Sequence, residues 1–485
     1  MTVKDATYWV QKWKKKEISL PEYYTELNRK VEQQNPALNA LVEWDFDALL
    51  KAVQNFKVTE EAPFSGLAIP LKMLGQEKAG WKSTFSSRLF PDNRSAQTSN
   101  FTSKLEQIGF IPAGQTNAPE FGFKNITDPT LYGSARNPWN LDHSPGGSSG
   151  GAAAAVASGL FPIAGASDGG GSIRIPASFS GLIGLKPTRG AMPNGPGGFR
   201  GWQGASIDFS LTVSMRDTEK LFYAMRGNDK VAPYHPPREE WETHVFPKRL
   251  RIAYSTTSPV HLPVSNEAKQ AVKHICEELQ ALGHDVVEVP YPVDGKKLMA
   301  SYYLMNGAET SSMFAGIEAQ LKRKMTSEDM ELMTWGIYQY GERLAAKSYV
   351  QALNLWDQAA FKMEELFQTY DLFLSPATAF SAPRIDQELQ SDEIRARLQM
   401  ADQLSEAELA DLVDAMFEKS LTLTPYTQLA NLTGQPAISL PTHVTAEGLP
   451  LGIQFMASKG REDLLLGVGK ILEEREQFKL PQAYS

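Results

Sequence analysis

Two glycine- and serine-rich clusters, separated by an apolar stretch, constrain this chain more than any other part of its sequence. The first cluster occupies residues 145–151 and the second occupies residues 167–176. The intervening segments 152–156 and 160–166 are apolar, which flexible linkers avoid. Neither cluster has the spacing of a phosphate-binding loop, GxxxxGK(S/T) or GxGxxG. We therefore expect both clusters to form tight turns inside a folded core.

The remaining apolar pattern predicts an α/β fold. A strand, a helix and a second strand follow one another between residues 250 and 289, which is a βαβ unit. This pattern predicts a mixed, mostly parallel central sheet surrounded by helices. The expected elements are strands at 65–75, 110–113, 250–254 and 285–289, and helices at 98–108, 266–282, 296–370 and 384–420.

Length and composition indicate one large globular domain. The chain has 485 residues, which at ~150 residues per domain corresponds to roughly three domains. However, it contains no internal repeat and no low-complexity linker. Hydrophobic residues make up 42% of the chain, so a large core is possible. We therefore expect a single domain that spans residues 1–485.

Charge and cysteine content exclude several classes of protein. The net charge of −8 argues against a nucleic-acid-binding surface as the main function. Cys276 is the one cysteine in the sequence, which excludes intrachain disulfides and thiolate metal clusters. No run approaches the ~18–20 apolar residues of a membrane span, and no apolar signal core follows the first residues. We expect a cytoplasmic protein that binds neither nucleic acid nor membranes.

Two serines compete as the nucleophile. Ser148 lies in a GxSxG sequence, the nucleophile elbow of α/β-hydrolases. That interpretation requires a histidine base, and none of the candidates has a telling context: His235, His244, His261, His274, His284 and His443. Ser172 instead follows three glycines, Gly169, Gly170 and Gly171. Residues without a Cβ allow successive backbone N–H groups to point at one spot, so Ser172 would come with its own oxyanion hole.

Lys72 is a candidate base for such a serine. It is a charged residue in the apolar run 67–74, and it could also be a lysine that extends from an edge strand to solvent. If it is buried instead, loss of solvation lowers its pKa. Its ordinary value of ~10.4 would have to fall to roughly 7–8 or below for general-base work.

Several ordered sequence blocks resemble the amidase signature family. Together they cover most of residues 60–225 and 425–470, whereas residues 230–420 match loosely, as expected of a region that shapes a substrate pocket. The blocks are GLAIPLK (66–72), GQTNAPEF (114–121), GSARNPWN (133–140), GGSSGG (146–151), DGGGSIRIP (168–176), GLIGLKPT (181–188), NLTGQPAISLP (431–441) and GLPLGIQ (448–454).

This resemblance implies an amidase that needs no metal or organic cofactor. Ser172 would be the nucleophile, Ser148 a bridging serine after a cis peptide bond, and Lys72 the base. An acyl-enzyme would form on Ser172. The oxyanion would bind the backbone N–H groups of the residues from Gly169 to Ser172. The supporting residues would be Ser149, Asp168 and Arg174.

The resemblance also bears on the substrate. The C-terminal blocks are most similar to bacterial general amidases and 6-aminohexanoate cyclic dimer hydrolases, which implies a small linear or cyclic amide. Asn306 is a candidate substrate contact, with a plain helix-surface asparagine as the alternative. The chain could act alone or as a homodimer. Departures from the family pattern are Met73, Gln115 and Gly169, and they leave the subfamily open.

Three other functions stay open at this point. The chain could be the A subunit of a glutamyl-tRNA(Gln) amidotransferase complex, which shares the triad but uses ammonia from glutamine. It could be a scaffold that kept the fold without activity. It could also be an esterase with Ser148 as its nucleophile.

Overall fold

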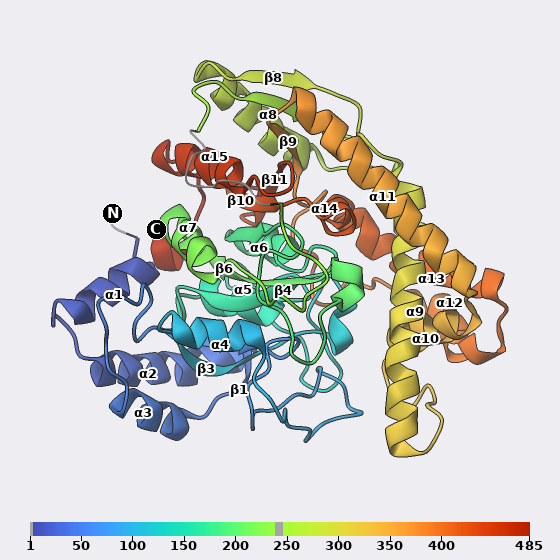
Figure 1. Ribbon diagram of the computed structural model, residues 1–485, viewed down its shortest axis with the longest axis horizontal. Coiled ribbons are helices and arrows are strands. Elements are labelled where there is room, and N and C mark those ends of the chain that lie inside the picture. The colour runs from blue at the N-terminus through green and yellow to red at the C-terminus, as the bar shows by residue number, and fades with distance from the viewer. Residues whose placement is uncertain (1–2, 238–245) are drawn as a thin grey trace.

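A long mixed sheet crosses the middle of the molecule (Figure 1). The computed structural model describes residues 3–237 and 246–485. Within these ranges the sheet has eight strands, in the order β4-β6-β5-β10-β11-β9-β7-β8. Their bounds are β4 Ala164–Asp168, β5 Ile183–Lys186, β6 Ile207–Thr212, β7 Arg251–Tyr254, β8 Asp285–Glu288, β9 Leu372–Pro376, β10 Ala437–Val444 and β11 Pro450–Met456.

The expected α/β class and mixed sheet are confirmed, but parallel pairs do not predominate. In the described part of this sheet β9–β7 and β7–β8 are parallel, and the other neighbouring strands are antiparallel. The predicted βαβ unit is present as β7, α8 (Asn266–Ala281) and β8. The local pattern could not reveal that β10 and β11 lie between β5 and β9. That arrangement pairs Ala437 with Lys186, far away in the sequence.

A smaller sheet packs against β4 through its edge strand. Its order is β1 (Leu41–Glu43), β3 (Ile111–Thr116) and β2 (Ala68–Lys72). All residues of β2 are buried, as the apolar run between glycines predicts, and β2 ends at Lys72. This placement brings the end of β2 close to the end of β4.

Helices cover the sheets and follow the predicted ranges closely. The helix expected at 98–108 is α4 (Asn100–Gln107), where the side chain of Ser99 accepts a hydrogen bond from the Thr102 amide as its cap. The Ala-rich segment after the first glycine cluster forms the fully buried α5. The other helices around the sheets are α1 Ala6–Lys14, α2 Leu20–Leu38, α3 Phe46–Gln54, α5 Gly150–Ala157, α6 Arg174–Ser180, α7 Met215–Met225, α14 Gln428–Thr433 and α15 Glu462–Glu474.

A second group of helices stands beside the sheet, with the long α9 nearest to it (Figure 1). The segments expected to be helical at 296–370 and 384–420 supply this group. α13 was expected at the surface, yet it buries Leu409, Leu412 and Met416 against α10 and α12. The bounds are α9 Gly295–Leu321, α10 Leu332–Arg343, α11 Ala346–Thr369, α12 Asp392–Gln399 and α13 Glu406–Leu423.

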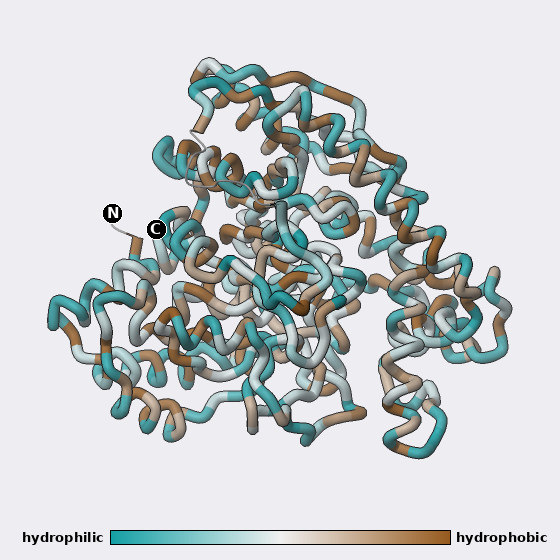
Figure 2. The backbone as a smooth tube through the Cα atoms, in the orientation of Figure 1, coloured by the Kyte–Doolittle hydropathy of each residue, from teal (hydrophilic) through white to brown (hydrophobic). Residues whose placement is uncertain are grey.

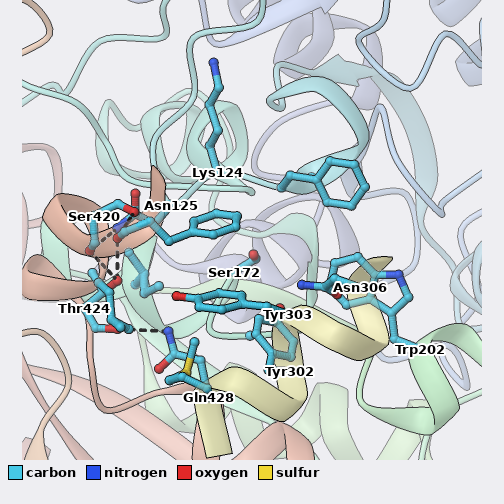
Figure 3. A pocket seen from close by; sticks show the side chains of 17 residues that line it. Lys124, Asn125, Ser172, Trp202, Tyr302, Tyr303, Asn306, Ser420, Thr424 and Gln428 are labelled. Atoms are coloured by element: carbon cyan, nitrogen blue, oxygen red, sulfur yellow. Dashed lines mark hydrogen bonds between the residues drawn. The ribbon is translucent and has the colours of Figure 1, made fainter. Parts of the chain in front are cut away.

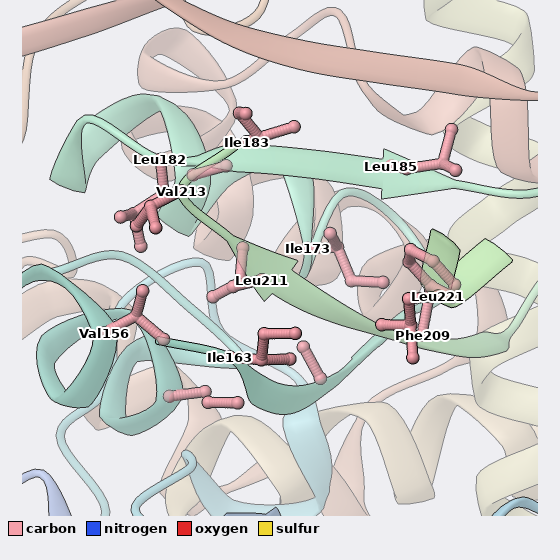
Figure 4. Packing of buried hydrophobic residues seen from close by; sticks show 14 of the residues in the cluster. Val156, Ile163, Ile173, Leu182, Ile183, Leu185, Phe209, Leu211, Val213 and Leu221 are labelled. Atoms are coloured by element: carbon pink, nitrogen blue, oxygen red, sulfur yellow. The ribbon is translucent and has the colours of Figure 1, made fainter. Parts of the chain in front are cut away.

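The main core lies between the large sheet and the helices α5 and α7. Figure 4 shows Val156 of α5 and Ile163 facing Leu211 of β6 in this core. Figure 2 shows hydrophobic and hydrophilic residues alternating along the outer helices, as expected when one face of a helix covers a core. Among the described residues, no helix combines the length and the apolar character needed to cross a membrane.

Candidate active site

The fold brings the predicted site residues together from three segments. Lys72 is the last residue of β2, and Ser148 lies just before α5. The third segment is the loop 169–173, which connects the end of β4 to α6. The segments converge because β2 packs beside β4 and α5 contacts both strands.

Lys72 is buried and makes hydrogen bonds with two hydroxyl groups. The residue is 1% exposed, which excludes the alternative of a side chain extended to solvent. Its Nζ atom donates to Ser148 Oγ and to Ser167 Oγ, each at 2.8 Å. Its backbone N–H donates to Gln76 Oε1 at 3.0 Å, so both ends of the residue are held in place.

Burial also changes the charge state of Lys72. Loss of solvation lowers the pKa of its ammonium group from 10.5 to about 7, although the carboxylates of Asp208 and Asp168 oppose the shift. Burial likewise raises the pKa of Asp208 to about 7; Glu77 adds to this effect and Lys72 opposes it. Near neutral pH a substantial fraction of Lys72 is therefore uncharged and able to accept a proton.

The loop that carries Ser148 is closely packed. The peptide bond between Gly147 and Ser148 is cis, as the resemblance implies. A Cβ atom at Gly147 would lie 2.5 Å from the Ile126 carbonyl oxygen, so this position requires glycine. The Ser149 hydroxyl donates to the carbonyl of Ser167 at 3.2 Å and accepts from the amide of the same residue at 3.3 Å. Ser149 thus connects this loop to β4, next to the partner of Lys72.

Asp168 and Arg174 form a buried ion pair across the second glycine cluster. Both side chains are fully buried, and Arg174 Nη2 lies 2.9 Å from Asp168 Oδ1. Two solvated surface charges, the alternative to this ion pair, are therefore excluded. Burial alone would raise the pKa of Asp168, but Arg174 and the amide of Asn431 lower it to about 2. The carboxylate therefore stays charged at neutral pH and fixes both ends of the loop.

The backbone of the glycine loop differs from the expected oxyanion hole at one position. The amide of Gly171 donates to Asp168 Oδ1 at 2.7 Å, and the amide of Ile173 donates to Asp168 Oδ2 at 3.2 Å. Because Asp168 already occupies the amide of Gly171, this residue shapes the loop and is not a free donor. Among the described residues, the amides of Gly170 and Ser172 have no such partner. The candidate donors are therefore Gly169, Gly170 and Ser172.

Ser172 lies at the wall of a cavity of about 520 Å³. Figure 3 shows Tyr302, Tyr303 and Trp202 around the cavity. Asn306 also lines it and is 3% exposed, so the predicted substrate contact is in a suitable place and is not a surface residue. In the described part of the chain, Lys72 is hydrogen-bonded to Ser148, but Ser172 is bonded to neither.

The structure argues against an esterase triad based on Ser148 and histidine. In the described residues, the hydrogen-bond partner of the Ser148 hydroxyl is Lys72. His274, His284 and His443 bond instead to Gln477, the amide of Leu250, and Glu267. His244 lies outside the described residues.

Sequence analysis missed three residues that hold this site. Ser167 accepts the second hydrogen bond from Lys72, and its place directly before Asp168 was an available signal. The Thr427 hydroxyl donates to the Gly170 carbonyl at 2.7 Å. The Asn431 amide donates to Asp168 Oδ1 at 2.8 Å. Both α14 contacts join segments about 260 residues apart, so no local pattern could show them.

Residues 22–466 match the sequence profile of the Amidase family. The chain belongs to the amidase signature family. A lipoamidase from Enterococcus faecalis is 39% identical to this amidase over 449 residues, which cover 93% of this chain and 60% of the relative. The chain therefore spans less than two thirds of that relative's length.

A second relative matches the amidase over nearly its whole length. The 6-aminohexanoate-cyclic-dimer hydrolase of Paenarthrobacter ureafaciens is 30% identical over 480 residues, covering 97% of this chain and 94% of the relative. The structure of 6-aminohexanoate cyclic dimer hydrolase complexed with substrate has a TM-score of 0.88, covers 99% of both chains and is 29% identical. These similarities confirm the expected fold and place this amidase among enzymes that hydrolyse amides.

Proposed function

We propose that this amidase cleaves amide bonds with Ser172 as nucleophile, Ser148 as proton relay and Lys72 as base. The observation that carries the proposal is the 2.8 Å contact between Lys72 Nζ and Ser148 Oγ, made by a buried lysine with a pKa of about 7. A base with this pKa suits proton transfer at neutral pH.

The proposed reaction begins with two coupled proton transfers. Neutral Lys72 accepts the proton of Ser148 while Ser148 accepts the proton of Ser172. The Ser172 oxygen attacks the amide carbonyl, and the amides of Gly170 and Ser172 bind the resulting oxyanion. Removal of one donor from such a hole typically costs about 3–4 kcal/mol.

The second half of the reaction regenerates the enzyme. The proton returns from Lys72 through Ser148 to the leaving nitrogen, the C–N bond breaks, and amine or ammonia leaves. An acyl ester remains on Ser172. Water then attacks this ester with the same residues as base and acid, which releases the carboxylic acid.

The cavity supports a small, uncharged linear or cyclic amide as substrate. Its wall includes the rings of Phe123, Trp202 and Tyr302, which suit aliphatic chains and exclude hydrated ions. Lys124 is the one charged residue among the described lining residues, and its ammonium group pairs with Glu331 and Asp128. Figure 3 shows the Lys124 side chain pointing away from Ser172.

The proposal does not include the amidotransferase or scaffold alternatives. The relatives that match over 90% of this chain are named as hydrolases or amidases. A silent scaffold has no need for a buried lysine in contact with two hydroxyl groups, because burial of an amine without functional gain is costly.

Hydrolysis of a panel of aliphatic, aromatic, peptide and cyclic amides, with glutamine included, tests the proposal. We expect the chain alone to release amine or ammonia, and Ser172→Ala to lower kcat by about 10⁴-fold or more. A fluorophosphonate should add to wild type but not to Ser172→Ala, as intact-mass measurement shows. Equal turnover by wild type and Ser172→Ala would contradict the proposal.

A further inference from the structure

The cavity beside Ser172 contains carboxamide oxygens that lack a hydrogen-bond partner. In the described residues these are Gln428 Oε1, Asn306 Oδ1 and Asn125 Oδ1. Gln428 is 8% exposed and Asn306 is 3% exposed. Buried polar atoms in folded proteins nearly always have partners, so their concentration in the cavity indicates that a ligand supplies the missing donors.

The orientation of the Gln428 carboxamide is fixed by its nitrogen. Nε2 donates to the carbonyl oxygen of Thr424 at 3.0 Å, as Figure 3 shows. A carbonyl can only accept, so the amide cannot be turned over without loss of this bond. Oε1 is therefore the atom left to contact a ligand, and it can only accept a hydrogen bond.

Gln428 is also firmly placed relative to the nucleophile. It is the first residue of α14, and the preceding Thr427 donates through its hydroxyl to the Gly170 carbonyl at 2.7 Å. The Thr427 carbonyl accepts from Arg174 at 2.7 Å. A substrate bound at Gln428 is thereby held in register with the loop that carries Ser172.

We propose that Gln428 determines substrate specificity by accepting a hydrogen bond from an uncharged N–H group away from the scissile bond. The inference rests on the proposed function and names its substrate class: amides that carry a second neutral N–H donor, such as a second amide. An ammonium group fits less well, because the described residues of the cavity wall include no carboxylate. The Asn306 oxygen, on α9, faces the same cavity and offers a second acceptor.

Matched substrates test this preference. The first pair is 6-acetamidohexanoyl-p-nitroanilide and 8-oxononanoyl-p-nitroanilide, in which CH2 replaces the second N–H. Related pairs vary the number of methylene groups or place the second amide on the amine side. We expect wild type to favour the N–H member of at least one pair by about 10- to 100-fold in kcat/KM, the range for leaving a buried acceptor unpaired.

Two variants separate the acceptor from the packing. Gln428→Met keeps an unbranched side chain of similar length, and we expect the preference to fall to about two-fold or less. Gln428→Glu keeps acceptor oxygens but adds a charge, and it should favour 6-aminohexanoyl-p-nitroanilide over the neutral N–H substrate. Because each result is a ratio within one protein, partial loss of folded enzyme does not obscure it.

Gln435→Met is the matched control. Gln435 is also buried with an unpartnered Oε1 in the described structure, but it does not line the cavity, so the preference should stay at the wild-type ratio. An unchanged ratio in Gln428→Met, or no N–H preference in any wild-type pair that is hydrolysed, would overturn the inference. Turnover of no amide at all, with Ser172 unlabelled, would instead contradict the proposed function.

Discussion

Two buried lysines, Lys72 and Lys186, share an unusual charge state but differ in their surroundings. Each is 1% exposed, and burial lowers the pKa of each to about 7. Lys72 donates to the hydroxyls of Ser148 and Ser167. Lys186, at the end of β5, donates to the carbonyl of Pro187 at 2.8 Å.

This difference shows that a depressed pKa does not by itself make a base. A carbonyl oxygen has no proton to give, so neutral Lys186 has nothing to deprotonate. Lys72 contacts a hydroxyl beside the cavity that contains Ser172. Structural networks and catalytic sites shift pKa values by the same physics, and the partner atom distinguishes the two.

Exchange of each lysine for methionine is the strongest test of this comparison. We expect Lys72→Met to lower kcat/KM by about 10²- to 10⁴-fold, the usual contribution of a general base. Lys186→Met should change it by less than about threefold, because surface or core changes away from the chemistry act mainly on stability. Steady-state kinetics on one amide substrate measures both effects.

Circular dichroism controls for folding in these variants. If both variants lost activity equally while staying folded, the partner atom would not be the deciding feature.

Removal of the relay serine should have the next largest effect. Ser148→Ala leaves Lys72 with Ser167 as its remaining hydroxyl partner, and we expect kcat to fall by about 10²-fold or more. Ser149→Ala is a neighbouring control that keeps the relay and removes only the contacts to Ser167. It should therefore cost much less activity, and a reversed order of the two effects would be evidence against a relay.

The pH dependence of the reaction separates the two lysines further. The base must be neutral, so kcat/KM should fall about tenfold per pH unit below the Lys72 pKa of about 7 and level off above it. Lys186→Met should leave the midpoint in place. Asp208→Asn removes a charge that raises the pKa of Lys72, so its midpoint should move to lower pH.

A pH–rate profile of kcat/KM on each variant measures these midpoints. A rate that stays flat from pH 5 to 9 would refute a lysine base.

Local sequence predicted one half of this site well. A single charge in the apolar run 67–74 identified Lys72, and three consecutive glycines identified the loop before Ser172. These signals work because burial of a charge and convergence of backbone amides require particular residue types at adjacent positions. The βαβ unit at 250–289 was predictable for the same reason.

Long-range contacts account for what the sequence did not reveal. Asn431 and Thr427 support the glycine loop from the far end of the chain. The insertion of β10 and β11 beside β5 makes the sheet mainly antiparallel in its described part. The amide of Gly171 is occupied by Asp168, and composition alone cannot tell a free donor from an occupied one.

The smallest expected effect concerns stability, where the two lysines should act alike. The unfolded chain protonates each lysine with a pKa of 10.5, whereas the folded protein does so at about 7. Between these values the unfolded state binds more protons, so the free energy of unfolding rises with pH, by up to about 1.4 kcal/mol per pH unit for each lysine. Lys72→Met and Lys186→Met should each reduce this slope by a similar amount between pH 7.5 and 9. Urea unfolding across that range measures it, with Lys15→Met, at an exposed position, as control. A reduced slope in only one variant would mean that the lysines differ in protonation as well as in chemistry.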